Sequence, residues 1–194
     1  LNDPANPGTF NGPILFDEKS TLDIALEDLD GDGDLDIVAA NEGANRIWFN
    51  ETVGTTFDLN DTPQEFDLPL VLPGGTLIYD YHQTRKVRTE DMDGDGRVDV
   101  VTAGTAGVNV WYQKSDGGFE TPPAATASIG EMTAAVGDVN GDTFPDFVTG
   151  TGKVYVRDAN DTRKYQLYQD FETTFTFAIC LADLDSDGSL DLAL

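Results

Sequence analysis

An aspartate-rich segment of nine residues, present four times, is the feature of this sequence that most constrains its fold. Positions one, three, five and nine of each copy are Asp, except that Asn140 occupies position three of the third copy. The copies begin at Asp28, Asp91, Asp138 and Asp183, at intervals of 63, 47 and 45 residues. Self-similarity at such a period indicates repeated supersecondary units that pack against one another.

The flanks of each copy have the composition of β-strands. A short run of apolar and β-branched residues precedes each copy, a second run follows it directly, and a third follows in three copies. Helical periodicity is weak throughout, so we predict an all-β fold of β-propeller blades with Asp-rich hairpin loops. The predicted first strands are 22–26, 87–89, 132–136 and 177–181, the second are 37–40, 100–103, 147–149 and 192–194, and the third are 47–49, 110–112 and 154–156. Weaker fourth strands are predicted at positions such as 13–16 and 124–128.

The repeat divides the chain into one propeller segment of four approximate units. These units are 3–50, 51–113, 114–157 and an incomplete 158–194, and the second carries an insertion at about 58–85. The sequence enters one unit midway and leaves another midway. We therefore expect a fragment of a larger propeller rather than a closed four-bladed ring. Remaining blades of the same propeller, or a neighbouring copy, would complete it.

The composition excludes several classes of partner. Eleven Lys and Arg against 36 Asp and Glu give a net charge of −25, which repels nucleic acids. No apolar stretch is long enough to span a membrane. Asp outnumbers Glu by 27 to 9, which favours turns and hard-cation ligands over helical surfaces. The single cysteine, Cys180, rules out a disulfide within this sequence, and its apolar neighbours predict a buried position.

The chemistry of the four loops points to Ca²⁺. This ion takes six to eight hard oxygens, which carboxylates at positions one, three, five and nine and a backbone carbonyl at position seven can supply. Positions four and six are mostly Gly, which allows the positive φ that brings the side chains together. A set of solvated Asx turns is the simpler alternative. An EF-hand is excluded because position twelve is Ala39, Thr102, Thr149 or Leu194, and none of these is the bidentate Glu that it requires.

The loops, the strands after them and the period together resemble the FG-GAP/VCBS repeats of integrin α-type β-propellers. The resemblance extends over the whole chain and implies about seven blades, with Ca²⁺ held between the first two strands of a blade. It implies up to four calcium sites, whose side-chain ligands are Asp28, Asp30, Asp32 and Asp36; Asp91, Asp93, Asp95 and Asp99; Asp138, Asn140, Asp142 and Asp146; and Asp183, Asp185, Asp187 and Asp191. The carbonyl ligands would come from Asp34, Arg97, Phe144 and Ser189. Loop 138–146 is expected to be the weakest site because Thr143 replaces Gly at position six.

For function, we expect an extracellular, calcium-stabilised module for adhesion or ligand binding, with a protein or glycan as its partner. The insertion would contribute Tyr79, Tyr81, His82 and Arg85 to the recognition surface, because long insertions on rigid scaffolds often bind ligands. The same residues could instead serve a lyase that cleaves acidic polysaccharides. Since no convincing catalytic constellation is present, we expect no enzymatic activity. A structural subunit of an extracellular assembly is the third alternative.

Three N-x-[ST] sequons, at Asn50, Asn60 and Asn160, are candidate glycosylation sites. All three follow predicted strands, where a glycan would be accessible. They favour a secreted or cell-surface protein.

Overall fold

The computed structural model describes residues 5–10, 12, 15, 19–53, 57–66, 70–71, 77–78, 83–120, 130–173 and 176–194. All regular structure in these ranges is β, and four antiparallel sheets form four propeller blades. Blade 1 contains β1 (Thr21–Glu27), β2 (Asp36–Asn41), β3 (Asn45–Trp48) and β4 (Gln64–Phe66). Blade 2 contains β7 (Thr84–Glu90), β8 (Asp99–Gly104) and β9 (Gly107–Trp111). Blade 3 contains β10 (Ala134–Gly137), β11 (Asp146–Thr149), β12 (Lys153–Asp158) and β13 (Asp161–Asp170), and blade 4 contains β14 (Cys180–Ala182) and β15 (Asp191–Ala193).

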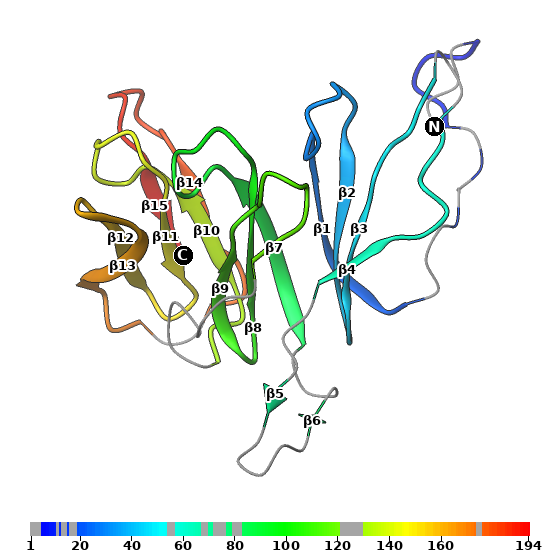
Figure 1. Cartoon of the computed structure of the whole chain (residues 1–194). Helices are drawn as coiled ribbons and strands as arrows, with labels where there is room; N and C mark the ends of the chain where they lie inside the picture. Colours follow the sequence, from blue (N-terminus) through cyan, green and yellow to red (C-terminus); the bar gives the residue numbers. More distant parts are fainter. Residues whose placement is uncertain are drawn as a thin grey trace.

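The sheets stand side by side, and the first strand of each blade lies next to the first strand of the following one (Figure 1). Thus β1 contacts β7, β7 contacts β10, and β10 contacts β14. This is the blade arrangement predicted from the repeat. Within a blade the strands meander in sequence order, so strands that are consecutive in the chain are neighbours in the sheet. No helix capable of crossing a membrane is found among the described residues.

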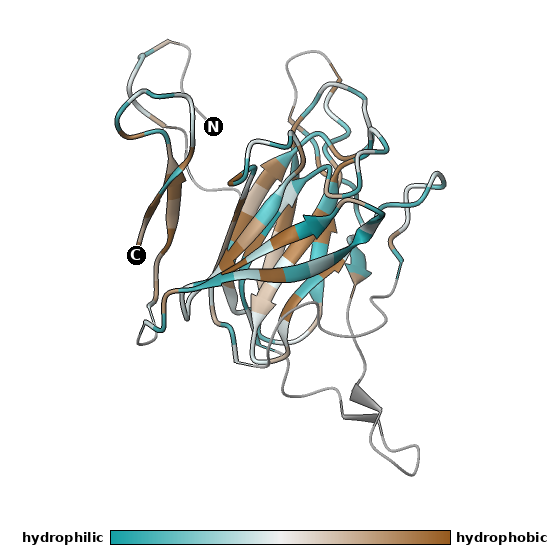
Figure 2. Cartoon of the chain, turned by 90° about the vertical axis from the view of Figure 1, so that its left-hand side faces the viewer, coloured by the Kyte–Doolittle hydropathy of each residue, from teal (hydrophilic) through white to brown (hydrophobic). Residues whose placement is uncertain are grey.

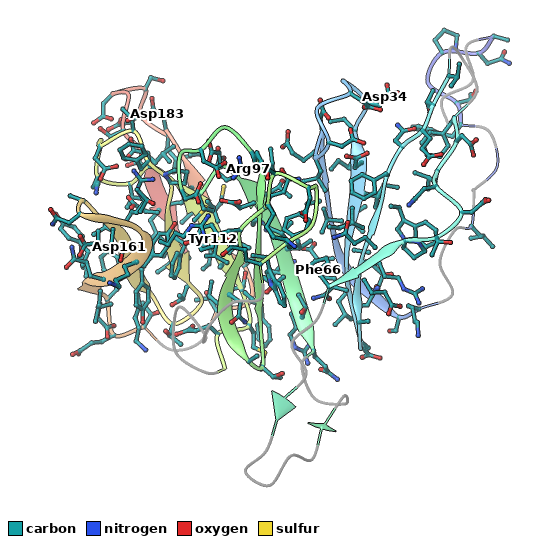
Figure 3. The ribbon with its side chains drawn as sticks, viewed as in Figure 1. Asp34, Phe66, Arg97, Tyr112, Asp161 and Asp183 are labelled. Atoms are coloured by element: carbon teal, nitrogen blue, oxygen red, sulfur yellow. The ribbon has the colours of Figure 1, made fainter. Side chains whose placement is uncertain are left out.

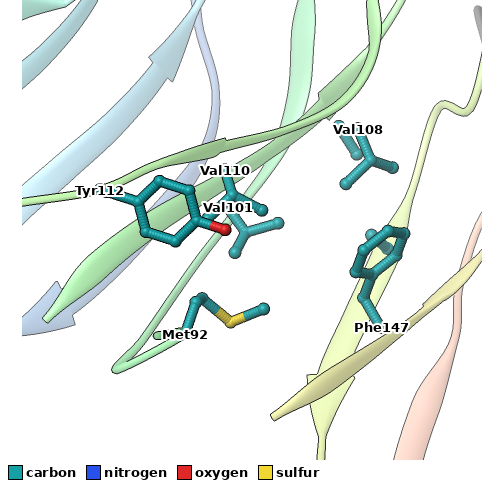
Figure 4. Packing of buried hydrophobic residues seen from close by; sticks show 8 residues of the cluster. Met92, Val101, Val108, Val110, Tyr112 and Phe147 are labelled. Atoms are coloured by element: carbon teal, nitrogen blue, oxygen red, sulfur yellow. The ribbon is translucent and has the colours of Figure 1, made fainter. Parts of the chain in front are cut away.

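Apolar side chains fill each junction between blades. Brown, hydrophobic segments lie along the strands in Figure 2, whereas the loops at the upper end carry more teal. Between blades 2 and 3 the core contains Met92, Val101, Val108, Val110, Tyr112 and Phe147 (Figure 4). The ring of Phe147 is fully buried and stacks on Tyr155 with 5.0 Å between centroids. Because successive strand residues point to opposite faces, every interior blade contributes to two such cores.

The two end blades each leave a face uncovered by described residues. Val87 of β7 and Ala134 of β10 are 1% and 2% exposed, because each packs against the preceding blade. Ile24 of β1 occupies the same register position before its loop but is 54% exposed. At the other end, Cys180 is exposed, so the prediction that it is buried is wrong. It lies on the face of β14 opposite to Leu181, which packs against blade 3.

Two elements differ from the simple repeat. The insertion of the second unit contains a small hairpin of β5 (Leu70–Val71) and β6 (Leu77–Ile78), which projects from the lower end of the molecule in Figure 1. In blade 3 a two-residue turn leads directly from β12 into the ten-residue β13, which the sequence pattern did not predict. The predicted strand 124–128 lies outside the described residues, as does most of 13–16.

Candidate metal centre

The four Asp loops are the hairpin connections between the first two strands of their blades. They lie at the same, upper end of the molecule, where Asp34, Arg97 and Asp183 are labelled in Figure 3. This end is opposite to the β5–β6 hairpin. The repeat therefore places one acidic loop on the same side of each blade.

The backbone of each loop turns sharply at positions four and six, as predicted. In loop 28–36, Gly31 and Gly33 have φ values of 79° and 94°. The non-glycine residues at equivalent positions adopt the same conformation, with φ of 75° at Thr143 and 66° at Ser186. The loop geometry is thus kept even where a side chain makes it costly.

The first carboxylate organises the loop by accepting backbone hydrogen bonds at both oxygens. Gly31 N donates to Asp28 Oδ1 at 2.8 Å, and Gly33 N donates to Asp28 Oδ2 at 3.0 Å. Asp91 and Asp138 accept the same two bonds in their loops. Carboxylates at positions three and five each accept one further backbone N–H, as Asp30 and Asp32 do. These bonds hold the acidic side chains toward the interior of the loop.

The ninth carboxylate is buried and connects the loop to the rest of its blade. Asp36 is 0% exposed, and it accepts bonds of 2.8 Å from Leu29 N at Oδ2 and from Asn50 N at Oδ1. The bond from Asn50 ties the loop to the segment after β3. Asp99 and Asp146 repeat both bonds in blades 2 and 3.

Burial and neighbouring acids make the loops electrostatically unfavourable without a cation. Burial raises the pKa of Asp99 to about 7, and the charges of Asp93 and Asp95 add to this rise. Desolvation likewise raises the pKa of Asp36 and of Asp146, with smaller contributions from nearby carboxylates. A bound divalent cation would favour the ionised form of each group and offset this cost.

Three of the loops bring carboxylates close enough to share one ion. In each set the ligand oxygens lie within 4.8 Å of one another, and the sets are Asp28, Asp30 and Asp32; Asp91, Asp93 and Asp99; and Asp183, Asp185 and Asp191. All nine residues were predicted as ligands from the sequence. Hard carboxylate oxygens in a polar loop fit Ca²⁺ better than a thiophilic metal. The structure brings these carboxylates together, whereas ligation of an ion by them, by the remaining carboxylates and by the carbonyls of Asp34, Arg97, Phe144 and Ser189 stays a prediction.

Loop 138–146 differs from the other three. Its position-three side chain is an amide, and Asn140 Nδ2 donates to Asp142 Oδ2 at 3.0 Å. The amide therefore engages one of the carboxylates predicted as a ligand. Together with the strained Thr143, this bond is consistent with the expectation that the loop is the weakest site.

We expect Thr143→Gly to stabilise the protein by about 1 kcal/mol, because relief of the left-handed strain outweighs the greater backbone entropy of Gly. Chemical denaturation of the two proteins would measure the difference. Thr162→Gly, at an exposed position of β13 with ordinary φ, is the control and should instead destabilise. Equal losses in the two variants would show that the backbone at Thr143 carries no strain.

Arginines near the loops form contacts that the sequence analysis missed. Arg163 of β13 crosses from blade 3 to blade 2, where Nε and Nη2 lie 2.9 and 2.8 Å from Asp93 Oδ2. Its Nη1 lies 2.8 Å from Glu120 Oε2, and its guanidinium stands 4.5 Å from the centroid of the Tyr112 ring. Arg97 of loop 91–99 turns back to pair with Asp95. Only the pairing of blades in space reveals the first of these contacts.

The residues predicted for ligand recognition are placed only in part. Tyr79, Tyr81 and His82 lie outside the described residues. Arg85 is exposed near the start of β7 and donates to Gln83 Oε1 at 2.9 Å. This position is at the far end of β7 from loop 91–99.

The three sequon asparagines lie in different environments. Asn160 is exposed in the turn between β12 and β13. The side chains of Asn50 and Asn60 are half-buried, and their Nδ2 atoms donate to the carbonyls of Leu35 and Thr62. Asn160 is thus the most accessible of the three.

Comparison with known proteins bears on the repeat. No curated protein sequence matches this chain. Among solved structures, the V. cholerae biofilm matrix protein Bap1 is similar, with a TM-score of 0.49 and 18% sequence identity. The similarity covers 90% of this chain but only 28% of Bap1. Residues 91–149, which run from the second Asp loop through the third, match the family of FG-GAP-like repeats, and this part of the chain is therefore an FG-GAP-like repeat.

Proposed function

We propose that this protein is an extracellular β-propeller module for adhesion or ligand binding, in which Ca²⁺ bound to the Asp loops is structural. The observation that carries this proposal is the convergence of three carboxylates in each of three repeated loops. Each loop is held in shape by backbone hydrogen bonds and connects the first two strands of its blade. An ion there would stabilise a scaffold rather than a reacting group.

The electrostatics favour an extracellular location. Extracellular calcium modules bind with dissociation constants of about 10⁻⁴–10⁻³ M, which suits exposed loops of this kind. A net charge of −25 also disfavours folding unless cations or salt screen it. Both effects support a protein that folds where calcium is abundant.

We further propose that the uncovered faces of the end blades pack against further polypeptide. This would be other blades of the same propeller or a neighbouring copy. The exposed Ile24 of β1 supports this, because Val87 and Ala134, at the equivalent positions of the interior blades, are buried. An exposed apolar face without such cover favours aggregation.

The alternative of a polysaccharide lyase has no specific support among the described residues. Its proposed base and charge-neutralising groups were Tyr81, His82 and Arg85, and the first two lie outside those residues. A purely structural role in an extracellular assembly is compatible with the same loops. We therefore propose a binding module without enzymatic activity.

A binding assay that includes an enzymatic arm tests this function. The calcium-loaded protein should retain a protein or glycan ligand from an extracellular-matrix preparation, and EGTA should release it as the scaffold loosens. The same protein should produce no unsaturated, ultraviolet-absorbing product from uronate polymers. Turnover of such a polymer that disappears in His82→Ala would instead establish the lyase.

A further inference from the structure

A groove beside the Asp loop is filled at one junction between blades and open at another. Equivalent residues can be matched through the bonds of the ninth carboxylate, which accepts from Asn50 N in blade 1, Gln113 N in blade 2 and Arg157 N in blade 3. Gln113 pairs across the turn with Phe119, and Arg157 pairs with Tyr165. The connection is two residues longer in blade 3, where the pairing shifts register after Arg157. Counted back two residues from Phe119 and Tyr165, Gly117 of blade 2 takes the place of Arg163 of blade 3.

Between blades 2 and 3 the groove is filled by the chain itself. The guanidinium of Arg163 lies between two carboxylates and the face of an aromatic ring, contributed by Asp93, Glu120 and Tyr112. Such a pocket suits a planar cation, because the carboxylates accept its fork of N–H groups while the ring attracts its face.

Between blades 1 and 2 no described residue fills the same groove. Gly117 has no side chain, and a Cβ built there would meet nothing within 4 Å. Two adjoining cavities of about 520 and 270 Å³ occupy the space. Both are lined by Leu29, Asp30, Gln113, Lys114 and Gly117.

The groups that would contact a cation are similar in the two grooves of this chain. Asp30 stands in place of Asp93, and Phe49 stands in place of Tyr112. Asp30 Oδ1 accepts the N–H of Asp32, and its Oδ2 receives no hydrogen bond from the described residues. Asp93 likewise accepts a backbone N–H of its own loop at Oδ1 and the guanidinium of Arg163 at Oδ2. One carboxylate can therefore hold its loop and bind a guanidinium at the same time.

The charge of the lining also favours a cation. Glu120 is replaced by Asn60 at the equivalent position, since Glu120 N and Asn60 N donate to the carbonyls of Tyr112 and Phe49. Glu51 lines the open groove and adds acidic charge. Of its basic residues, Lys114 is 3.6 Å from Asp116 and Arg97 pairs with Asp95, so both cations are already partnered.

We propose that the groove between blades 1 and 2 binds an arginine side chain of a partner protein, in the way that Arg163 fills the groove between blades 2 and 3. The guanidinium lies over the ring of Phe49 and donates to Asp30, with Glu51 at the rim. This inference deepens the proposed ligand-binding function and rests on it. Gly117 leaves this groove open because it has no side chain, whereas Arg163 fills the groove between blades 2 and 3.

Titration of the calcium-loaded, isotope-labelled protein by NMR tests the site. The probe is a short Gly/Ser peptide with one central Arg, compared with matched peptides carrying citrulline or Lys. The Arg peptide should shift the amides of residues 29–31 and 114–118 saturably, and the citrulline peptide should bind about tenfold more weakly or worse. Equal binding of the Arg and citrulline peptides would overturn the proposal. So would shifts of these amides by a neutral oligosaccharide but not by the Arg peptide.

Variants locate the interaction in the groove. Gly117→Arg should fill the groove with the protein's own arginine and lower affinity for the Arg peptide by about tenfold or more. Gly43→Arg is the matched control, because Gly43 also has positive φ and open space but lies in the turn between β2 and β3. If Gly117→Arg does not fold, Glu51→Lys places a cation at the rim and should weaken binding similarly. Unchanged affinity in whichever variant folds contradicts the proposal, whereas a normal calcium titration alongside it leaves the calcium-dependent scaffold intact.

Discussion

Removal of calcium is expected to lower the melting temperature by about 5–10 °C for each occupied loop. At a free Ca²⁺ concentration about one hundred times the dissociation constant, binding to the folded state alone contributes about 2.7 kcal/mol per site. In a protein of this size, 1 kcal/mol changes the melting temperature by about 2–4 °C. Three carboxylate triads would then account for a large part of the usual stability of a domain.

Differential scanning calorimetry in calcium and in EGTA would measure this effect. Because the protein carries a charge of −25, any salt stabilises it by screening, so NaCl of matched ionic strength is a necessary control. Mg²⁺ is a second control and should substitute poorly, since it requires a smaller octahedral site. The same melting temperature in EGTA, in NaCl and in calcium would show that the loops hold no structural ion.

Asp36→Asn is expected to destabilise the protein by about 2–4 kcal/mol in EGTA, and by at least as much in calcium. The side chain is fully buried and accepts N–H bonds from Leu29 and Asn50, and an amide group would turn a donor toward one of them. An unsatisfied buried N–H costs about 1–3 kcal/mol, and the new donor adds its own unpaired group. Urea denaturation at both calcium levels would measure the loss.

Asp32→Asn is the matched control for this measurement. Asp32 belongs to the same loop and to the carboxylate triad, but it is exposed. Its replacement should weaken stability in calcium and have little effect in EGTA. If Asp36→Asn behaved in the same calcium-dependent way, the ninth carboxylate would act only as a ligand and not as a link between loop and blade.

The blade architecture could be predicted because its signal is local and repeated. The Asp spacing fixed each hairpin, and the second strand of every blade includes nearly all of its predicted residues. The positive φ at Thr143 could also be predicted, because the other three copies of the repeat have Gly at the same loop position. Long-range features could not be predicted in this way. The contact between Arg163 and Asp93 joins residues seventy positions apart, and only the packing of blade 3 on blade 2 brings them together.

Cys180 shows the limit of an inference from composition. Its apolar neighbours predicted burial, yet burial at that position depends on a blade covering the outer face of β14. Its counterpart in blade 3, Ala135, is 6% exposed. The two residues have similar local sequence and differ only in what lies on the other side of the strand.

A hydrogen bond between neighbouring blades also recurs. Its acceptor is the backbone carbonyl of the residue that follows the first Asp of a loop, and its donor is a side chain of the next blade. Gln113 Nε2 of blade 2 donates to Leu29 O of blade 1 at 2.7 Å, and Tyr165 Oη of blade 3 donates to Met92 O of blade 2 at 3.3 Å. Each accepting carbonyl lies inside an Asp loop, so an ion bound in that loop would stiffen the acceptor for the next blade. Coupling would then pass between nearest neighbours along the array, as in linear repeat proteins. Loss of the ion from loop 28–36 would loosen the junction with blade 2, while the junction of blades 2 and 3 would depend on loop 91–99.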